Sequence, residues 1–417
     1  MKGLLLHRRS LVLTTIFVAA VSTLVQCINQ DTKKQTETAK EHSTQLVGDA
    51  ACASCHKSIY VSHLATAHFH TSEKADAENI KGSFEPGKNS FSFTSGGTVL
   101  MEKQPSGFHQ TVYVNGVQKK SQRFDLTFGS GAKGQSYASW TGNHLVQLPI
   151  TWFTTAEQWS NSPGYPNKIS LNRIITSRCI ECHATYAKVL SDPGIEAEEY
   201  DKASMVLGVA CEKCHGPGAQ HVNYQTQHPA DSVAKFIINP KGFSRAQSLD
   251  MCALCHGGRL EKTKPSFSFK PGDKLSDFFV IDPTPGNAEL IDVHGNQYGL
   301  LTASKCFRQS ETMTCMTCHN PHANEKGNTT LFSQRCMNCH ADGHANTVTC
   351  KLKASMGASI NNHCTGCHMP EQPSKAIAVI LQGADTLTPA FMHTHLIKSY
   401  PSATEKVLAN MTAANGT

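Results

Sequence analysis

The stretch Cys52-Ala-Ser-Cys55-His56 places two cysteines with two residues between them and a histidine directly after the second cysteine. This CxxCH pattern occurs seven times in the 417 residues. Numbered in chain order, the motifs are Cys52-Ala-Ser-Cys55-His56 (motif 1), Cys179-Ile-Glu-Cys182-His183 (motif 2), Cys211-Glu-Lys-Cys214-His215 (motif 3), Cys252-Ala-Leu-Cys255-His256 (motif 4), Cys315-Met-Thr-Cys318-His319 (motif 5), Cys336-Met-Asn-Cys339-His340 (motif 6) and Cys364-Thr-Gly-Cys367-His368 (motif 7). A histidine follows each of these cysteine pairs, so one chemistry is repeated along the chain.

The spacing of the motif matches the covalent attachment of haem. Two thiols at this distance can add to the two vinyl groups of one haem, and the next histidine can bind the iron as its first axial ligand. Composition alone would give on the order of 0.04 accidental matches in a chain of this length. The sequence therefore predicts seven covalently attached haems c. The motif cysteines are the expected attachment points, and the motif histidines are the expected iron ligands.

Two other uses of CxxC pairs explain the pattern less well. Structural zinc sites do not need a histidine after each second cysteine, and seven pairs do not divide evenly into four-cysteine sites. A thioredoxin-like redox site explains one CxxC pair and not seven. Haem attachment accounts for both the number of pairs and the histidines.

The chain contains 22 histidines, more than the seven motifs use. Once His7 and His42 are set aside as parts of the N-terminal segments, thirteen remain for the second axial positions of seven irons. The surplus permits two histidines on every iron, which gives lower reduction potentials than histidine with methionine. Methionine stays open as a ligand at one or two sites.

The first 27 residues have the features of an export signal. Lys2, Arg8 and Arg9 precede an apolar run of about 15 residues, which is short for a membrane span of roughly 20 residues. Cys27 then stands where lipoprotein signals carry a lipid-modified cysteine. We expect a protein of the periplasm or outer membrane, lipid-anchored at Cys27. Simple cleavage and an uncleaved anchor remain alternatives.

Composition divides the rest of the chain into four segments. Residues 28–46 are polar without periodicity, which is typical of a solvated tether. Residues 47–85 carry motif 1. Residues 86–165 lack cysteine and alternate apolar with polar residues around the turn Asn115-Gly116, which predicts an antiparallel β-meander. Residues 166–417 carry the other six motifs and a C-terminal closing segment. We expect a mainly α and irregular multihaem cytochrome c fold organised around haems, with the β-meander inserted.

Local sequences around the motifs resemble one family of multihaem cytochromes. The segments are CHKSIYVSHLATAH, which ends at His68, CHGPGAQH, which ends at His221, CHNPH, which ends at His322, and THLIKSYP, which contains His395. In these segments the chain is similar to cytochromes of the c-552/4 type, which are related to the tetrahaem electron acceptor of hydroxylamine oxidoreductase. His63 stands where members of the family often have tryptophan.

The resemblance implies that His68, His221, His322 and His395 are second axial ligands. The histidines that correspond to His221 and His322 bind a neighbouring haem in the family, and the one that corresponds to His395 closes the final haem. His393 is the alternative to His395. The resemblance also implies closely packed haems, alternately parallel and perpendicular, between which electrons move.

The remaining histidines have no assignment from the sequence. His294, His344 and His363 fit a surface or core position as well as they fit iron binding. A surface or core position is the simpler interpretation of a second group, which consists of His63, His70, His109, His144 and His228. None of these histidines is predicted as a ligand.

Three further patterns have simple interpretations. Residues 129–134 fit GxGxxG but lie between two predicted strands with no helix after them, so they indicate a turn and not a dinucleotide site. Cys306 and Cys350 lie outside the motifs, and a disulfide is expected between them, with free thiols or a cysteine iron ligand as alternatives. Cys350-Lys351 is similar to the CxxCK site of pentahaem nitrite reductases, but the first cysteine is missing.

These features predict an electron carrier. The net charge is +6, and three of the positive charges lie in the export signal, so a nucleic acid partner is not expected. The expected partners are redox proteins, such as a quinol-linked donor, a reductase or other cytochromes, and the membrane through the lipid anchor. The alternative is an oxidoreductase that acts on a small nitrogen or sulfur compound at one haem with an open coordination position. No catalytic residue is assigned. The β-meander could also serve as a docking module in either case.

Overall fold

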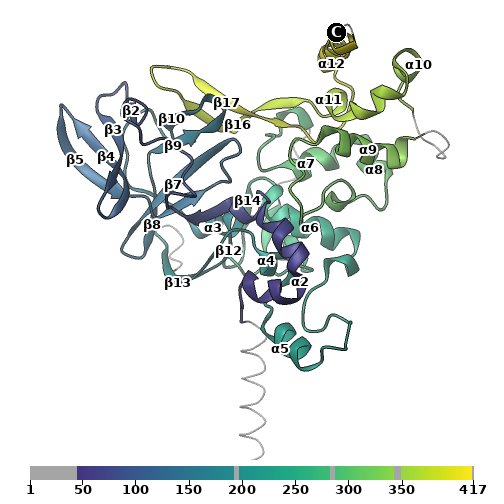
Figure 1. Ribbon diagram of the computed structural model, residues 1–417, viewed down its shortest axis with the longest axis horizontal. Helices are drawn as coiled ribbons and strands as arrows, with labels where there is room; N and C mark the ends of the chain where they lie inside the picture. The colour runs from purple at the N-terminus through teal and green to yellow at the C-terminus, as the bar shows by residue number, and fades with distance from the viewer. Residues whose placement is uncertain (1–44, 192–196, 282–286, 342–348, 416–417) are drawn as a thin grey trace, which may run out of the picture.

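The computed structural model describes residues 45–191, 197–281, 287–341 and 349–415. The predicted export signal, the predicted lipid anchor at Cys27, nearly all of the predicted tether and His344 lie outside the described residues. The described residues are 34% helix and 27% strand. The expectation of a mainly α and irregular fold was therefore wrong. The fold is mixed, with a β region on one side of the molecule and a helical region on the other (Figure 1).

The β region consists of a four-stranded and a seven-stranded sheet. The strands are β1 (Ser72–Lys74), β2 (Ser90–Ser92), β3 (Thr98–Gln104), β4 (Gly107–Val114), β5 (Val117–Arg123), β6 (Leu126–Phe128), β7 (Gly134–Thr141), β8 (His144–Gln147), β9 (Ile150–Phe153), β10 (Gln158–Asn161) and β11 (Arg173–Ile174). The smaller sheet has the order β2-β3-β4-β5. The larger has the order β1-β6-β7-β8-β11, and β9 pairs with both β7 and β10. Strands that are neighbours in this sheet are not always consecutive in the chain, so the sheet is not a simple meander.

The turn between β4 and β5 follows from its two residues. Asn115 and Gly116 both have positive φ, at 51° and 74°. Asparagine and glycine adopt this conformation at lower cost than other residues, and it matches the twist of the flanking strands.

The two sheets share one apolar core. Phe91, Val99 and Met101 of the four-stranded sheet meet Tyr137 and Trp159 of the seven-stranded sheet, and all five are at most 1% exposed. The indole N–H of Trp159 donates a hydrogen bond of 2.7 Å to a backbone carbonyl, so burial leaves no polar atom of this ring unpaired. The β region therefore has a well-packed interior of its own.

Strands also lie well beyond the predicted β insertion. They form three two-stranded sheets, β12 (Ala184–Ser191) with β13 (Glu199–Leu207), β14 (Leu260–Lys262) with β15 (Phe279–Ile281), and β16 (Glu371–Ile380) with β17 (Leu387–His393). The β16–β17 hairpin reaches back to the β region (Figure 1), where Val379 and Ala390 pack on Phe153. This hairpin of the C-terminal segment therefore packs against the β region.

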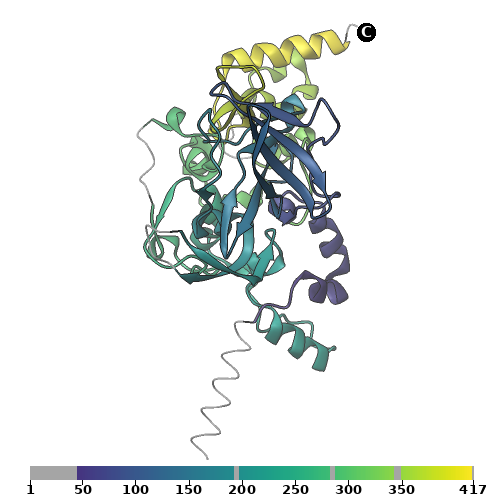
Figure 2. The same cartoon turned by 90° about the vertical axis from the view of Figure 1, so that its left-hand side faces the viewer.

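The helices are short and most of them carry a motif. They are α2 (Asp49–Leu64), α3 (Ser177–His183), α4 (Cys211–His215), α5 (Ala219–Gln227), α6 (Arg245–His256), α7 (Gln297–Thr302), α8 (Lys305–Gln309), α9 (Thr329–His340), α10 (Lys353–Met356), α11 (Cys364–His368) and α12 (Pro401–Asn415). Figure 2 shows α12 and α5 at opposite ends of the molecule. Among the described residues, no helix combines the length and the apolar character that crossing a membrane requires.

Each motif lies on a helical turn. Motifs 2, 3, 4, 6 and 7 end their helices at the motif histidine. In α2 the helix kinks at His56, which has φ −110° and ψ 38°, and motif 5 begins with the short helix η6 (Cys315–Thr317). A helical turn brings residues i and i+3 to one face, with residue i+4 beside them. Both cysteines and the histidine of a motif are thus presented together.

Candidate haem-binding sites

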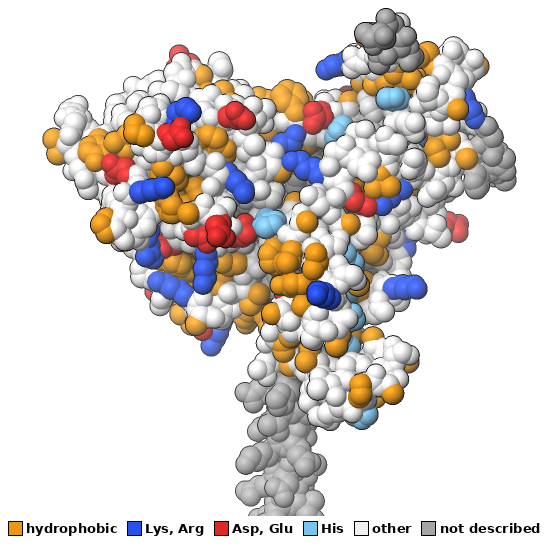
Figure 3. Space-filling view, viewed as in Figure 1, with side chains coloured by type: hydrophobic (Ala, Val, Ile, Leu, Met, Phe, Trp, Pro, Cys, Tyr) orange, Lys and Arg blue, Asp and Glu red, His pale blue; other side chains and the backbone are white. Residues whose placement is uncertain are grey.

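One large cavity runs through the helical region. Its volume is about 2980 Å³, several times that of small-molecule pockets, which hold roughly 300–1,000 Å³. Cysteines and histidines of motifs 1, 3, 4, 5, 6 and 7 line it. Figure 3 shows histidine side chains recurring along this region from one end to the other. Of the described residues of motif 2, only Glu181 lies in the lining.

Motif histidines face histidines from distant parts of the chain. The ring centroids lie 6.5 Å apart for His56 and His221, 6.1 Å for His68 and His256, 6.0 Å for His215 and His322, and 5.9 Å for His319 and His395. An imidazole nitrogen binds a transition metal at about 2 Å, so two rings on opposite sides of one iron have centroids roughly 6 Å apart. All four separations match this geometry.

The structure thus brings together the four non-motif histidines that the resemblance singled out, each with a motif histidine. His68 lies near His256 of motif 4, although it follows motif 1 in the chain. His395 stacks on His319 of motif 5, and not on a histidine of the last motif as the resemblance implied. His393 instead points a ring nitrogen at the carbonyl of Met369, 2.6 Å away.

Burial keeps several of these rings neutral. It lowers the pKa of His256 and of His395 to about 4. At pH 7 both imidazoles are therefore uncharged, which is the form that binds iron. Nδ1 of His395 is buried without a hydrogen-bond partner. Buried polar atoms are rarely left without a hydrogen-bond partner. An unpaired nitrogen beside the cavity is expected where a bound group occupies the adjacent space.

Backbone carbonyls orient three motif histidines. Nδ1 of His183 lies 3.2 Å from the carbonyl of Thr71, Nδ1 of His215 lies 2.9 Å from that of Ile238, and Nδ1 of His368 lies 3.1 Å from a third carbonyl. A carbonyl can only accept, so Nδ1 must donate its proton. Nε2 is then the unprotonated nitrogen that is free to bind a metal. The cavity, the ring pairs and these tautomers all fit haem.

Comparisons with known proteins agree with this chemistry. A family model described as "Cytochrome c554 and c-prime" matches residues 134–216, which include motifs 2 and 3. The C-type polyheme cytochrome OmcC of Geobacter sulfurreducens is 25% identical over 208 residues, which cover 46% of this chain and 25% of OmcC. The multiheme cytochrome MtrA of Shewanella baltica is 24% identical over 181 residues, which cover 39% of this chain and 52% of MtrA. The chain is a multihaem c-type cytochrome.

A solved structure resembles the fold of this cytochrome. The outer cell wall cytochrome OcwA superposes with a TM-score of 0.52 at 16% identity, over 87% of this chain and 82% of OcwA. At this identity the likeness concerns the fold alone. The matched part spans about a quarter of OmcC and half of MtrA. The family model and these relatives imply covalently bound haem c.

Motif 2 of the cytochrome lies apart from the large cavity, against the β region. The His183 ring meets Phe128 of β6 edge to face at 5.7 Å. Burial lowers the pKa of His183, and the nearby His294 adds to the shift. His294 therefore lies close to this site, which the sequence left open.

The histidines that the sequence left without an assignment mostly have protein partners. His63 points Nε2 at the carbonyl of Val209 at 3.0 Å. The rings of His70, His109, His144 and His228 are also hydrogen bonded. His363 lines the cavity, and His344 lies outside the described residues.

Cysteines of different motifs meet in pairs. Cysteine side chains of different motifs lie close enough to shift each other's pKa, and the pairs are Cys52 with Cys211, Cys182 with Cys255, Cys252 with Cys315, and Cys336 with Cys364. The pairs place motif 1 beside motif 3, motif 4 beside both motif 2 and motif 5, and motif 6 beside motif 7. Sequence spacing gives no sign of this order, since the contacts depend on the tertiary fold.

The two cysteines outside the motifs are not bonded to each other. Cys306 and Cys350 are both free thiols, and both line the cavity. The expected disulfide between them was therefore wrong. Cys306 contributes to the raised pKa of Cys318, which is caused mainly by burial, so it lies near motif 5.

Proposed function

We propose that this cytochrome carries seven covalently attached haems and transfers electrons outside the cytoplasmic membrane, between membrane-linked donors and terminal reductases or partner cytochromes. The observation that carries the proposal is the set of four histidine pairs at 5.9–6.5 Å, each formed by distant parts of the chain. Iron held between the two rings of each pair would account for this spacing.

Haem supplies an iron that takes up and releases one electron. The chain holds and orients it. In this proposal the fourteen motif cysteines form the thioether bonds and the motif histidines bind the irons. His68, His221, His322 and His395 are the second ligands at motifs 4, 1, 3 and 5. Two histidines on one iron leave no open position for a substrate, which favours electron transfer over catalysis at these four sites.

The contacts between motifs support electron transfer. Motif 4 lies beside motifs 2 and 5, motif 1 lies beside motif 3, and motif 6 lies beside motif 7. Arg335, next to motif 6, donates a hydrogen bond to the carbonyl of Cys318 in motif 5. The attachment turns therefore lie close enough together for a series of redox centres along the helical region.

The cellular setting is part of the proposal. Residues 1–27 would direct export, and Cys27 would carry a lipid anchor that holds the protein in the periplasm or at the outer membrane. A resembling structure is described as an outer cell wall cytochrome, which is consistent with this location. The partners would be other redox proteins.

Mass spectrometry and electron paramagnetic resonance test the proposal together. The mature protein should exceed its polypeptide mass by seven haems. The oxidised protein should give only low-spin ferric signals, unchanged by nitrite or hydroxylamine. A smaller mass increment would contradict seven attachments. A high-spin signal that shifts with either compound would indicate an open haem and an enzyme instead of a carrier.

A further inference from the structure

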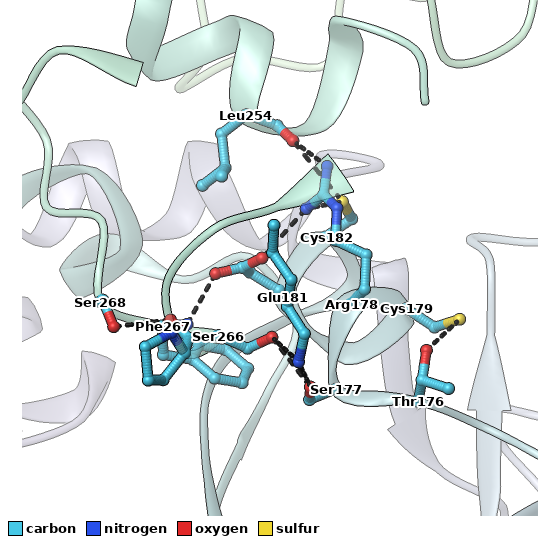
Figure 4. A network of polar contacts seen from close by, with 12 residues as sticks. Thr176, Ser177, Arg178, Cys179, Glu181, Cys182, Leu254, Ser266, Phe267 and Ser268 are labelled. Carbon is cyan, nitrogen blue, oxygen red and sulfur yellow. Dashed lines mark hydrogen bonds and ion pairs between the residues drawn. The ribbon is translucent and has the colours of Figure 1, made fainter. Parts of the chain in front are cut away.

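Motif 2 is tied to motif 4 by one arginine. Arg178 directly precedes Cys179, and its guanidinium donates a hydrogen bond of 2.7 Å to the carbonyl of Leu254. Leu254 lies between the two cysteines of motif 4. The other end of the guanidinium lies 3.1 Å from the Glu181 carboxylate and 3.2 Å from the Cys182 sulfur, both in motif 2 (Figure 4).

Glu181 fixes the arginine from the motif 2 side. Its carboxylate is only 1% exposed and also accepts a 2.6 Å hydrogen bond from the backbone N–H of Phe267. A buried carboxylate is tolerated when it is paired and hydrogen bonded, and both conditions are met here. The Arg178 guanidinium in turn lies 4.9 Å from the centre of the Phe279 ring. The side chain is therefore held at both ends and on one face.

The cysteine beside this arginine also lies next to motif 4. The sulfur of Cys182 in motif 2 lies 3.8 Å from the carbonyl oxygen of Leu254, and Cys182 and Cys255 of motif 4 are near enough to shift each other's pKa. Arg178 thus lies where the two attachment turns meet. Its planar fork can reach two acceptors in different directions, which the single ammonium of lysine cannot reproduce.

We propose that Arg178 is a positioning residue that locks the attachment turn of motif 2 against that of motif 4 and so sets the electronic contact between these two sites. The proposal rests on the proposed function, because it assumes that both motifs hold haem. In this proposal motif 2, which lies apart from the large cavity, forms a side branch of the series of haem sites. The branch meets the series at motif 4.

A similar arrangement occurs where other motifs lie next to each other. Glu212 of motif 3 accepts hydrogen bonds from the N–H groups of Val47 and Gly48, which lead into the helix of motif 1. Arg335 beside motif 6 reaches the carbonyl of Cys318 in motif 5. A charged side chain next to or within one motif therefore repeatedly holds the backbone at or near another.

The test compares Arg178→Lys and Arg178→Met with wild type, all as full-length holoprotein. Arg123→Met is the matched control, because Arg123 also pairs with a carboxylate close to it in the chain, that of Asp125, but lies on β5. Mass spectrometry counts the haems, and electron paramagnetic resonance of the oxidised protein detects magnetic coupling between neighbouring irons. We expect unchanged haem number in all variants, and loss of one spin-coupled component in both Arg178 variants but not in the control.

Arg178→Lys keeps the positive charge but loses the planar guanidinium, so it distinguishes a positioning role from an electrostatic one. If Arg178 acted only through its charge, the spin-coupled component of Arg178→Lys would be the same as in wild type, and that result would overturn the proposal. Loss of one haem from Arg178→Lys would overturn it as well, because Arg178 would then serve attachment and not spacing. If Arg178→Met fails to mature, Arg178→Lys decides. A wild-type mass short of seven haems would count against the proposed function, and it is measured before any variant is compared.

Discussion

The imidazole rings in this cytochrome are oriented by hydrogen bonds to the residues around them. Nδ1 of His215 donates to a backbone carbonyl, which leaves Nε2 to face His322. The partner ring of each pair comes from another segment and approaches to about 6 Å. The chemistry of a site therefore depends on single side chains, and single substitutions should change one iron at a time.

Replacing His395 with alanine should open one iron. The centroids of the His395 and His319 rings lie 5.9 Å apart, so in the proposed assignment the loss of His395 removes the second ligand at motif 5. We expect one high-spin ferric signal in place of one low-spin signal, with haem number unchanged because the cysteines remain. His393→Ala is the control, since that exposed ring is bonded to the carbonyl of Met369. Low-spin signals in the His395 variant, or a high-spin signal in the control, would contradict the ligand assignment.

Glu325 should make stability depend on pH in the acid range. A hydrogen bond from Arg335 is the main cause that lowers the pKa of Glu325 to about 2. An unfolded glutamate titrates near about 4.3, so the stabilisation is complete above that pH and is lost as pH falls toward 2.

Glu325→Gln should remove this dependence. Acid unfolding followed by circular dichroism should show a flatter decline between about pH 4.5 and 2 than in wild type. Glu85→Gln is the control, because the pair of Glu85 with Lys88 is 71–73% exposed and contributes little. Acid curves of the Glu325 variant and wild type that run parallel would show that the pair does not stabilise the fold.

Helical turns form the elements that matter most for the site. Five helices end at the motif histidine, so the helix presents the motif and the next segment is free to turn away. Such helices have few turns and little stability of their own. Contacts between elements must hold them in place.

Glu212 on α4 provides such a contact. Its carboxylate accepts hydrogen bonds from the N–H groups of Val47, Gly48 and Gly218 at 2.8–3.0 Å, and so joins the starts of α2 and α5 to motif 3. Glu212→Gln should lower the free energy of unfolding by about 1–3 kcal/mol, since a charged hydrogen bond is replaced by a weaker one. Denaturant titration measures the loss, and amide exchange should quicken at residues 47 and 48.

Glu261→Gln is the matched control for this change. Glu261 is an exposed residue on β14, and its substitution should leave stability within about 0.5 kcal/mol of wild type. Equal effects of the two substitutions would mean that the bonds of Glu212 do not hold the elements together.

The molecule as a whole has two kinds of interior. The β region is filled by large side chains such as Trp159 and Tyr137, which are at most 1% exposed. The helical region surrounds a cavity of about 2980 Å³ and has only small apolar clusters. Haem is the expected filling of that space, so the two regions should differ in their dependence on it.

Protein made without haem attachment should fold in part. We expect limited proteolysis to spare a fragment of the β region and to cut the helical region at many places, because the former has the larger core of side chains. The holoprotein, treated in parallel, should resist cleavage in both regions. Equal resistance of the helical region with and without haem would show that haem is not its core.

Local chemistry is what the sequence by itself determined. The seven motifs, the thiol spacing and the following histidine lie within five residues each, so their geometry is set by one helical turn and covalent bonding. The family also followed from motifs of this length. The hairpin turn at Asn115-Gly116 was equally local, since it depends on the φ preferences of two residues.

Tertiary structure decided everything that joins distant segments. His68 and His256 are 188 positions apart and meet only because α6 folds beside the end of α2, and for the same reason His395 lies beside His319 of motif 5, which the sequence did not predict. The hairpin of β16 and β17 was missed because it is stabilised by packing on Phe153, far away in the chain. The hydrogen bond from Arg178 to the carbonyl of Leu254 was not predicted from the sequence either. The spacing of residues in the sequence determines the geometry within one helical turn. Contacts between distant segments depend on the packing of the whole chain.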